Sequence, residues 1–385
     1  MRELFLLDPE ITFLNHGSFG ATPKPVWDVY LAWQARLERQ PVKFMARELS
    51  GELKKARRVL GQYLNADADD LVFIPNATFG VNLVARSLDL KPDDEILMTD
   101  HEYGACENVW EFLSTKKGFK AIRQPIRLPL RSPQQVAEQF WQGVTSRTRA
   151  IFISHITSPT AIRLPVELIC RYARAAGIMT IIDGAHAPGQ IAVDLEAIDP
   201  DFYLGNCHKW MMSPKGAGFL YTRKAAQPQV EPLVVSWGWG ENASYSTGSR
   251  YIDRLEWCGT KDPSAYLSVP AAISFQAEHA WPKVQSCCQE ILSEAIDRLN
   301  FLTGLETIYL PECEPFVQMA VARLPGAVDL VELKQALDQQ YRVEVPCIQW
   351  GEEKFIRVSV QGYNTPSDID LLVTALESLL QNYLR

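Results

Sequence analysis

One segment of the sequence places a carboxylate where acid–base chemistry is expected. In residues 179–189 an apolar run ends at Asp183, which Gly184, Ala185 and His186 follow. Ligands of open α/β sheets bind at the carboxyl ends of the strands, so a carboxylate at this position faces a cleft. A buried carboxylate can keep a pyridinium nitrogen protonated through a charge-assisted hydrogen bond. The alternative is that Asp183 only caps the next helix or turn.

A second segment, residues 202–221, carries a candidate amine nucleophile. Lys209 follows a short apolar run and precedes a glycine-rich turn. Its neighbours His208, Trp210 and Met211 exclude water, which lowers the pKa of the amine and favours its neutral form. A neutral amine can form a Schiff base with an aldehyde. The alternative is a lysine whose stem lies along a partly buried strand while its charge reaches water.

A third segment, residues 71–88, has the features of a phosphate site. An apolar run passes through a turn at residues 75–80 into an amphipathic helical pattern expected from about Val81. Backbone N–H groups and the dipole at the helix start would bind a phosphate, and the Thr78 hydroxyl adds a donor. An ordinary Asn or Thr helix cap would explain the same turn.

The elements that must position these residues follow from the apolar pattern. Short apolar runs alternate with helical patterns, which predicts strands of a largely parallel sheet that are buried on both faces. The runs are residues 71–74, 95–98, 150–154, 179–182, 202–204 and 218–221. Helices are expected at residues 51–64, with Ser50 as the N-cap, and from Pro165 to a stop at Gly177.

The second part of the chain has a different pattern. Residues 236–248 are rich in Trp and Gly and predict a long loop. A long helical pattern at residues 271–301 is followed by alternating strand and helix patterns. We therefore expect a large domain at residues 15–267 and a small domain at residues 268–385 that also takes in residues 1–14.

Composition excludes several classes of function. The 385 residues carry a net charge of -8 without a basic block, so nucleic acid is not expected as a partner. The eight cysteines show neither zinc-ligand spacing nor a disulfide framework. No apolar run approaches the roughly 20 residues that a membrane span needs, and the N-terminus lacks a signal-peptide pattern. These features predict a cytoplasmic protein without a metal.

The three segments, in this order along the chain, resemble those of a known enzyme family. The motifs DGAH (183–186), NCHKW (206–210) and SPKGAGFLY (213–221) resemble those of fold-type-I pyridoxal phosphate (PLP) enzymes of the class V aminotransferase and cysteine desulfurase superfamily. Four further motifs are similar to isopenicillin N epimerase-like proteins: LNHGSFGATP (14–23), PNATFGVN (75–82), DHEYGA (100–105) and RVSVQGYNT (357–365). The resemblance covers nearly the whole chain. It implies an α/β fold with a mostly parallel seven-stranded sheet between helices, a smaller C-terminal α/β domain, PLP as cofactor and a homodimer with shared active sites.

The resemblance also implies roles at the cofactor. Lys209 would hold PLP as a Schiff base, Asp183 would pair with its ring nitrogen, and His186 would donate to its phenolic oxygen. Tyr103, with His101 as second choice, would lie on the ring face unless it is an ordinary packing residue. The remaining positions concern the phosphate and the ring edge: Ala77, Thr78, Asn206 (Ser in many relatives) and His208 at the phosphate, Thr260 at the phosphate of the other subunit, and Ser158 beneath the phenolic edge.

Four residues are expected near the substrate. The guanidinium of Arg357 can bind an amino-acid carboxylate through two hydrogen bonds, although an exposed strand arginine is the alternative. In this family Asn15 and His16 would lie near the substrate, and a turn-forming Asn-His-Gly is the alternative. Arg47 is a candidate for a distal substrate carboxylate.

The reaction has several possible outcomes. Epimerisation needs a second acid, such as Tyr103 or a water, across the ring from Lys209. A desulfurase needs a cysteine nucleophile, and Cys347 lies ten residues before Arg357 in a segment that is expected to be a buried strand. A carbon–sulfur lyase or an aminotransferase needs neither a second acid across the ring nor a cysteine nucleophile. A catalytically silent scaffold of the same fold is the remaining alternative.

Overall fold

The computed structural model describes residues 1–240, 245–310, 316–381 and 383. Its centre is a seven-stranded sheet in the order β2-β8-β7-β6-β5-β3-β4. Neighbouring strands run parallel except where β8 pairs with β2 and β7. The strands are β2 (Leu71–Ile74), β3 (Glu95–Thr99), β4 (Lys120–Gln124), β5 (Thr148–Ser154), β6 (Met179–Gly184), β7 (Phe202–Asn206) and β8 (Gly218–Thr222).

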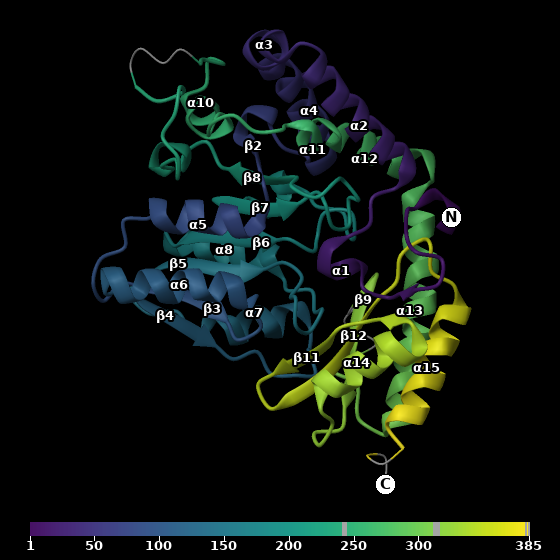
Figure 1. Ribbon diagram of the computed structural model, residues 1–385. Helices are drawn as coiled ribbons and strands as arrows, with labels where there is room; N and C mark the ends of the chain where they lie inside the picture. The colour runs from purple at the N-terminus through teal and green to yellow at the C-terminus, as the bar shows by residue number, and fades with distance from the viewer. Residues whose placement is uncertain (241–244, 311–315, 382, 384–385) are drawn as a thin grey trace.

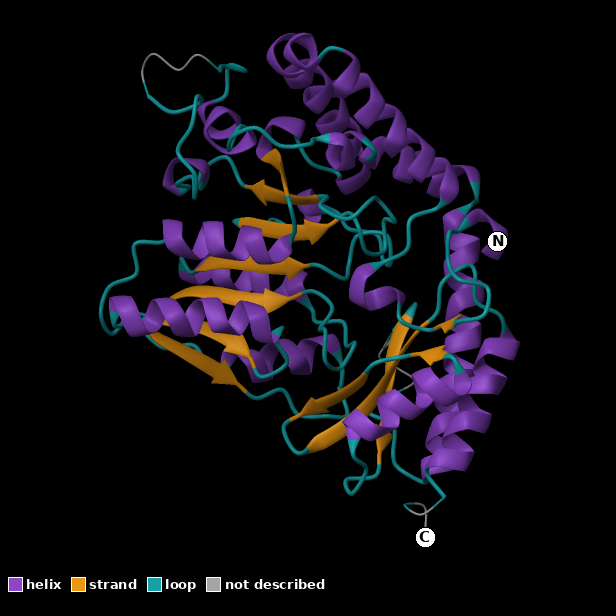
Figure 2. Cartoon of the chain, in the orientation of Figure 1, coloured by secondary structure: helices purple, strands orange, loops and turns teal. Residues whose placement is uncertain are grey.

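Helices cover both faces of this sheet, as Figures 1 and 2 show. Alternate residues of a strand point to opposite faces, so Ile181 packs in one apolar cluster and Ile182 in the other. The cluster around Ile181 includes α5 (Ala77–Ser87) and α6 (Gly104–Lys117), and the cluster around Ile182 includes α4 (Leu49–Leu64), α7 (Pro133–Trp141) and α8 (Val166–Ala176). Double burial explains why these strands are continuous apolar runs.

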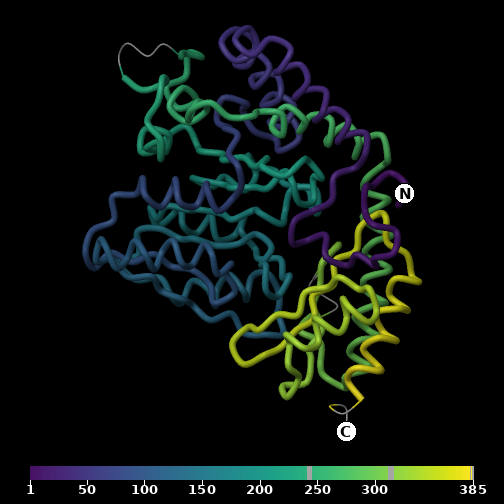
Figure 3. Tube along the Cα trace, in the orientation of Figure 1, coloured from purple at the N-terminus to yellow at the C-terminus, as the bar shows by residue number. Residues whose placement is uncertain are grey.

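The C-terminal part of the chain forms a second, smaller layer structure. Its antiparallel sheet has the order β11-β12-β9, and helices α13 and α15 pack beside it. The elements are α13 (Trp281–Thr303), β9 (Met319–Leu324), α14 (Leu330–Tyr341), β10 (Val343–Glu344), β11 (Cys347–Trp350), β12 (Glu353–Ser359) and α15 (Pro366–Leu379). β1 (Thr12–Phe13) pairs parallel with β10, so the N-terminal segment lies beside the C-terminal part in Figure 3.

The remaining elements of the described chain are all helical. The helices are η1 (Arg2–Leu4), α1 (His16–Phe19), α2 (Lys24–Arg39), α3 (Pro41–Lys43), η2 (Phe44–Glu48), η3 (Ala68–Asp70), α9 (Leu195–Ile198), η4 (Gln227–Gln229), α10 (Arg250–Glu256), α11 (Ser264–Leu267) and α12 (Val269–Glu278). Within the expected loop 236–248, residues 241–244 lie outside the described residues. None of the described helices is both long and apolar enough to cross a bilayer.

Three local expectations were wrong. α4 begins before Ser50 and has no side-chain cap, so Ser50 lies inside the helix. α5 begins at Ala77 and not near Val81, because the Asn76 side chain accepts the Phe79 N–H and caps the helix earlier. The pattern at 271–301 is two helices, since Ala280 adopts a left-handed conformation (φ 47°) between α12 and α13.

Two further differences concern the edge of the sheet and the domain boundary. The expected strands omitted β4, whose residues are exposed or half-buried at the sheet edge and therefore form no apolar run. α12, the first helix after Ser268, packs against α2 and α4, which are helices of the large domain. We therefore propose a boundary near Ala280.

Candidate active site

A cavity of about 300 Å³ lies at the carboxyl ends of β5, β6 and β7. Parallel strands place their carboxyl ends at one sheet edge, which brings together residues from distant parts of the chain. Nine expected candidates line this cavity: Ala77, Thr78, Tyr103, Ser158, Asp183, His186, Asn206, His208 and Lys209. The structure thus places the candidate amine and the candidate carboxylate in one site.

Lys209 meets His186 inside the cavity. Its Nζ lies 3.1 Å from Nε2 of His186, and Nε1 of Trp210 donates to Nδ1 of the same ring at 3.3 Å. Burial and, second to it, the nearby charge of Arg357 lower the pKa of Lys209 to about 8. Burial also lowers the pKa of His186 well below its usual value. A neutral amine is therefore available from about pH 8 upward, well below the usual range of a lysine, beside an imidazole that is already neutral.

Asp183 is a buried carboxylate without a cationic partner in hydrogen-bond reach among the described residues. Its Oδ1 accepts the Ala185 N–H at 2.9 Å, and its Oδ2 lies 3.6 Å from Sγ of Cys106, which donates to it. Burial raises the pKa of the Asp183 carboxyl, while the Ala185 bond and the charge of Lys209 act in the opposite direction. The alternative was that Asp183 only caps the following turn. The capping bond from the Ala185 N–H is present, but it engages only Oδ1 of the carboxylate.

The N-terminus of α5 forms the other end of the cavity. The Ala77 N–H donates to Oδ1 of Asn206 at 2.9 Å, and the Phe79 N–H donates to Oδ1 of Asn76 at 2.9 Å. No contact within the described part of the chain engages the Thr78 N–H, so Thr78 and not Ala77 offers the free backbone donor. The bond from Ala77 also orients the Asn206 amide, whose Nδ2 remains a donor.

His208 and Lys215 add basic groups to the same end. Nδ1 of His208 donates to the Ala217 carbonyl at 2.9 Å, and burial lowers the pKa of this imidazole to about 4. Lys215 also lines the cavity, and its Nζ donates to the Gly20 carbonyl at 2.9 Å. The sequence analysis missed Lys215, although it stands six residues after Lys209 within a quoted motif.

Arg357 lies behind the cavity wall. Its Nη1 donates to the carbonyl and hydroxyl oxygens of Ser158 at 2.5 and 3.1 Å, and its Nη2 donates to Oγ of Ser18 at 3.2 Å. Ser158 and Ser18 both line the cavity. Burial lowers the pKa of Arg357 to about 10, and its Nε has no hydrogen-bond partner in the described structure. The guanidinium is buried, not exposed on a strand, and pairs with no described carboxylate.

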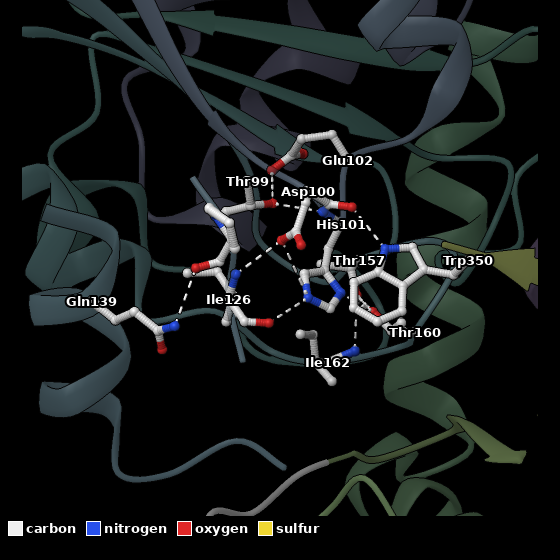
Figure 4. Close-up of polar contacts among 11 residues, drawn as sticks. Thr99, Asp100, His101, Glu102, Ile126, Gln139, Thr157, Thr160, Ile162 and Trp350 are labelled. Atoms are coloured by element: carbon white, nitrogen blue, oxygen red, sulfur yellow. Dashed lines mark hydrogen bonds and ion pairs between the residues drawn. The ribbon is translucent and has the colours of Figure 1, made fainter. Parts of the chain in front are cut away.

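Tyr103 and His101 occupy different places. Tyr103 is the residue before α6, is 46% exposed and lines the cavity. His101 is buried beyond the cavity wall, where its ring nitrogens contact Thr160 Oγ1 at 2.8 Å and the Ile126 carbonyl at 3.0 Å (Figure 4). Tyr103 is therefore the only one of the two placed to meet a ligand in this cavity.

Four other candidates do not line the cavity. His16 is buried, with Nδ1 3.0 Å from the Tyr363 hydroxyl and Nε2 3.1 Å from the Lys209 carbonyl, so it supports the lysine backbone and not the substrate. Asn15 Nδ2 donates to Glu344 at 2.8 Å and Oδ1 accepts from Ser18. Arg47 is exposed on η2. Thr260 is also exposed, and its expected role across a dimer stays a prediction.

A buried polar group beside Asp183 was not anticipated. Glu102 accepts from the Thr99 hydroxyl at 2.6 Å and from the N–H and hydroxyl of Ser154 at 2.9 and 2.5 Å. Burial and, to a smaller extent, the charge of Asp183 raise the pKa of Glu102 to about 8. Ser154 pairs in register with Asp183 and lines the cavity. No periodicity or motif in the sequence indicated this contact.

The residues of the cavity fit PLP chemically. Its lining offers an amine of lowered pKa, a buried carboxylate that lacks a cation, and a helix N-terminus with Thr78 for an anion. Among the described residues no cluster of His, Cys, Asp or Glu fits a metal ion.

Comparison with known sequences gives relatives that cover almost the whole chain. The family described as aminotransferase class-V matches residues 23–372. The isopenicillin N epimerase of Amycolatopsis lactamdurans is 36% identical over 390 residues, covering 98% of this chain and 97% of the relative. That of Streptomyces clavuligerus is 34% identical, with the same coverage. A probable chloroplastic L-cysteine desulfhydrase of Arabidopsis thaliana is 28% identical over 97% of this chain and 84% of the relative.

Solved structures share the fold. The cysteine desulfurase CsdA from Escherichia coli superposes with a TM-score of 0.82 at 21% identity, covering 99% of this chain and 98% of that one. The cystine C–S lyase C-DES, solved with its product cysteine persulfide, gives a TM-score of 0.82 at 20% identity, covering 96% and 98%. These likenesses confirm the expected fold-type-I architecture, with a large, mostly parallel sheet and a smaller C-terminal sheet.

Proposed function

Because this chain belongs to the class V aminotransferase family, a family of PLP-dependent enzymes, we propose that it inverts the α carbon of an amino acid, as an epimerase does. The observation that carries this proposal is that two proton carriers, Lys209 and Tyr103, line one cavity from different elements. Supporting it, isopenicillin N epimerases are 36% and 34% identical over nearly full length. A non-catalytic scaffold is not proposed for an enzyme of this family.

Each residue has a role in the proposed reaction. PLP, when bound, withdraws the electron pair left at the α carbon. Asp183 would pair with the ring nitrogen, and Thr78 and Asn206 would bind the phosphate. Arg357 would bind the substrate carboxylate through a pair of hydrogen bonds. Lys209, neutral above about pH 8, would remove the α proton, and the Tyr103 phenol would return one from the other side.

A carbon–sulfur lyase is the second candidate, because relatives named L-cysteine desulfhydrases match at 28% identity and below. The desulfurase alternative has less support. Cys347 begins strand β11, as predicted, but the expected burial is wrong, since this edge strand is half-buried to exposed; Cys347 does not line the cavity. Burial raises the pKa of its thiol to about 12, so little thiolate is available at neutral pH. Aminotransfer would need no further residue and has no observation in its favour.

The test uses the PLP-loaded enzyme and a panel of L-amino acids in deuterated water. Deuterium at the α carbon with inversion of configuration supports the epimerase. Release of sulfide or pyruvate, or of an α-keto acid with conversion of the cofactor to its amine form, would replace the epimerase by the lyase or the aminotransferase. The matched control is Tyr103→Phe, which should still exchange the α proton through Lys209 but should lose inversion.

We also propose a homodimer with shared sites in a reducing compartment such as the cytoplasm. In support, Phe19 lines the cavity yet is 71% exposed, and Val235 and Trp237 are 62% and 67% exposed. The seven cysteines of the described chain are all unpaired. Sedimentation equilibrium tests the dimer, and mixing Lys209→Ala with an inactive Thr260→Arg variant should restore activity in hybrids only if sites are shared.

A further inference from the structure

Two loops that border the active-site cavity are tied to each other. The loop after β3 carries Tyr103, and the loop after β5 carries Ser158. His101 joins them, because its Nδ1 lies 2.8 Å from Oγ1 of Thr160, which in turn contacts the Thr157 hydroxyl at 2.8 Å. Figure 4 shows this group with the Trp350 side chain beside it.

Trp350 connects the first loop to the C-terminal sheet. Its Nε1 donates to the Asp100 carbonyl at 2.7 Å, and its ring stacks on His101 with centroids 4.1 Å apart and an interplanar angle of 26°. The Asp100 side chain is held as well, since its Oδ1 accepts the Ile126 N–H at 2.9 Å. Trp350 and Tyr103 also line the same outer cavity, next to the active site.

The same hairpin carries Arg357, the arginine proposed to bind the substrate carboxylate. β11 ends at Trp350 and pairs antiparallel with β12, which contains Arg357. Arg357 donates to Ser158 on the second loop. The β11–β12 hairpin therefore contacts both loops, at Asp100 and His101 through Trp350 and at Ser158 through Arg357. Antiparallel pairing sets the spacing of the two contacts.

From these contacts we propose that Trp350 is a positioning residue, which sets the place of Tyr103 relative to Arg357 and so controls proton return to the α carbon. This inference rests on the proposed function, in which Tyr103 returns the proton. Among the described residues, Trp350 makes no hydrogen bond or ring contact with Lys209 or Asp183, so we expect proton removal by Lys209 to proceed without it.

The test compares Trp350→Phe with the wild-type holoenzyme. Phenylalanine loses the hydrogen bond to Asp100 but keeps an aromatic ring next to His101, and we therefore expect the variant to fold. The matched control is Trp141→Phe, another half-buried tryptophan, which packs edge-on against Tyr172 with centroids 5.5 Å apart and lies outside the cavity. Gln349→Ala, on the same strand but exposed, controls for general effects on the hairpin.

The first readout is independent of activity. Backbone hydrogen exchange, followed by mass spectrometry, should be roughly tenfold faster in peptides covering residues 100–106 of Trp350→Phe, with β6 unchanged. The second readout is the ratio of inverted to retained product among α-deuterated molecules, which should fall about tenfold in Trp350→Phe while total α-deuteration stays within about twofold. Both control variants should behave as wild type in both readouts.

The outcomes separate this inference from the proposed function. Unchanged hydrogen exchange in residues 100–106, or an equal loss of inversion and total deuteration, would overturn the positioning role of Trp350. If instead the wild type shows no inversion, or Tyr103→Phe retains it, the proposed function or its acid fails. In that case the hydrogen-exchange result still decides whether Trp350 holds the loop.

Discussion

Lys209 Nζ lies 3.1 Å from Nε2 of His186, whose other ring nitrogen accepts the Trp210 indole N–H. Because an indole N–H can only donate, the neutral imidazole carries its proton on Nε2. That proton points toward the amine, which can accept it only in its uncharged form. Burial, together with the nearby charge of Arg357, lowers the pKa of Lys209 to about 8, so the uncharged amine that this contact needs is available from about pH 8 upward.

This pKa predicts how the apoenzyme takes up its cofactor. Only the neutral amine attacks an aldehyde, so the rate at which Lys209 bonds to added PLP should rise with pH and level off above about pH 8. A lysine of ordinary pKa would show the same rise only near 10.5. Stopped-flow absorbance across pH 6 to 10 measures the midpoint. A midpoint near 10 would show that the amine is solvated in the apoenzyme.

Replacing the amine should remove the covalent link. In Lys209→Ala we expect no turnover and no cofactor adduct after borohydride reduction. The matched control is Lys215→Met, since Lys215 lines the same cavity but donates to the Gly20 carbonyl. Mass spectrometry of reduced, digested protein locates the adduct. An adduct on another lysine in the Lys209→Ala protein would refute the assignment.

Replacing the buried carboxylate should separate binding from catalysis. An amide cannot keep the ring nitrogen charged, so Asp183→Asn should bind PLP yet lose roughly a hundredfold or more in α-proton exchange. Nuclear magnetic resonance in deuterated water measures the exchange. Cys106→Ala, which removes only the weak thiol contact to Asp183, serves as the control and should lose far less. Equal rates in Asp183→Asn and wild type would mean that this carboxylate has another role.

Removing the strand cysteine should leave the reaction intact. Cys347 sits on β11 with a thiol pKa near 12, outside the cavity. Cys347→Ala should therefore keep kcat within about twofold for every substrate that the enzyme accepts. Steady-state kinetics check this, with Cys258→Ala as a control for thiol loss elsewhere. A large, selective loss of sulfur release in Cys347→Ala would favour a desulfurase.

Buried histidines predict loss of stability in acid. Burial lowers the pKa of His155 to about 3, from 6.5, and Nδ1 of this ring contacts the Tyr203 hydroxyl at 2.9 Å. Below pH 6.5 the unfolded state binds a proton that the folded state does not, so the free energy of unfolding falls as pH drops from 6.5 toward 3.

The expected contribution is about 1.4 kcal/mol per pH unit for one such histidine. Urea unfolding of wild type and His155→Gln apoenzymes between pH 5 and 7 measures it. The variant should lose less stability over this range, even if it is less stable at pH 7. Two curves of equal slope would show that His155 is protonated in the folded state.

Much of the candidate active site could be predicted from the sequence, because each of its segments is determined by residues that are neighbours in the chain. A buried strand, its terminal Asp183, and the turn into α5 are each encoded within a few neighbouring residues, as are the poorly hydrated surroundings of Lys209. The parallel order of the strands then requires that their carboxyl ends share one edge. The ends of helices did not follow from the sequence in the same way. The start of α5, for example, depends on which side chain accepts the free N–H groups of its first turn, and the structure shows that Asn76 does.

What the amino-acid sequence determined by itself was the set of doubly buried strands and the two reactive side chains, because burial and charge act on short segments. The tertiary structure alone decided that Arg357 lies behind Ser158, that His16 supports the Lys209 backbone, and that Trp350 holds the loop before Tyr103. These pairs are 199, 193 and 250 residues apart in the chain. No local pattern encodes such contacts, since they exist only once both sheets have formed and the side chains have packed.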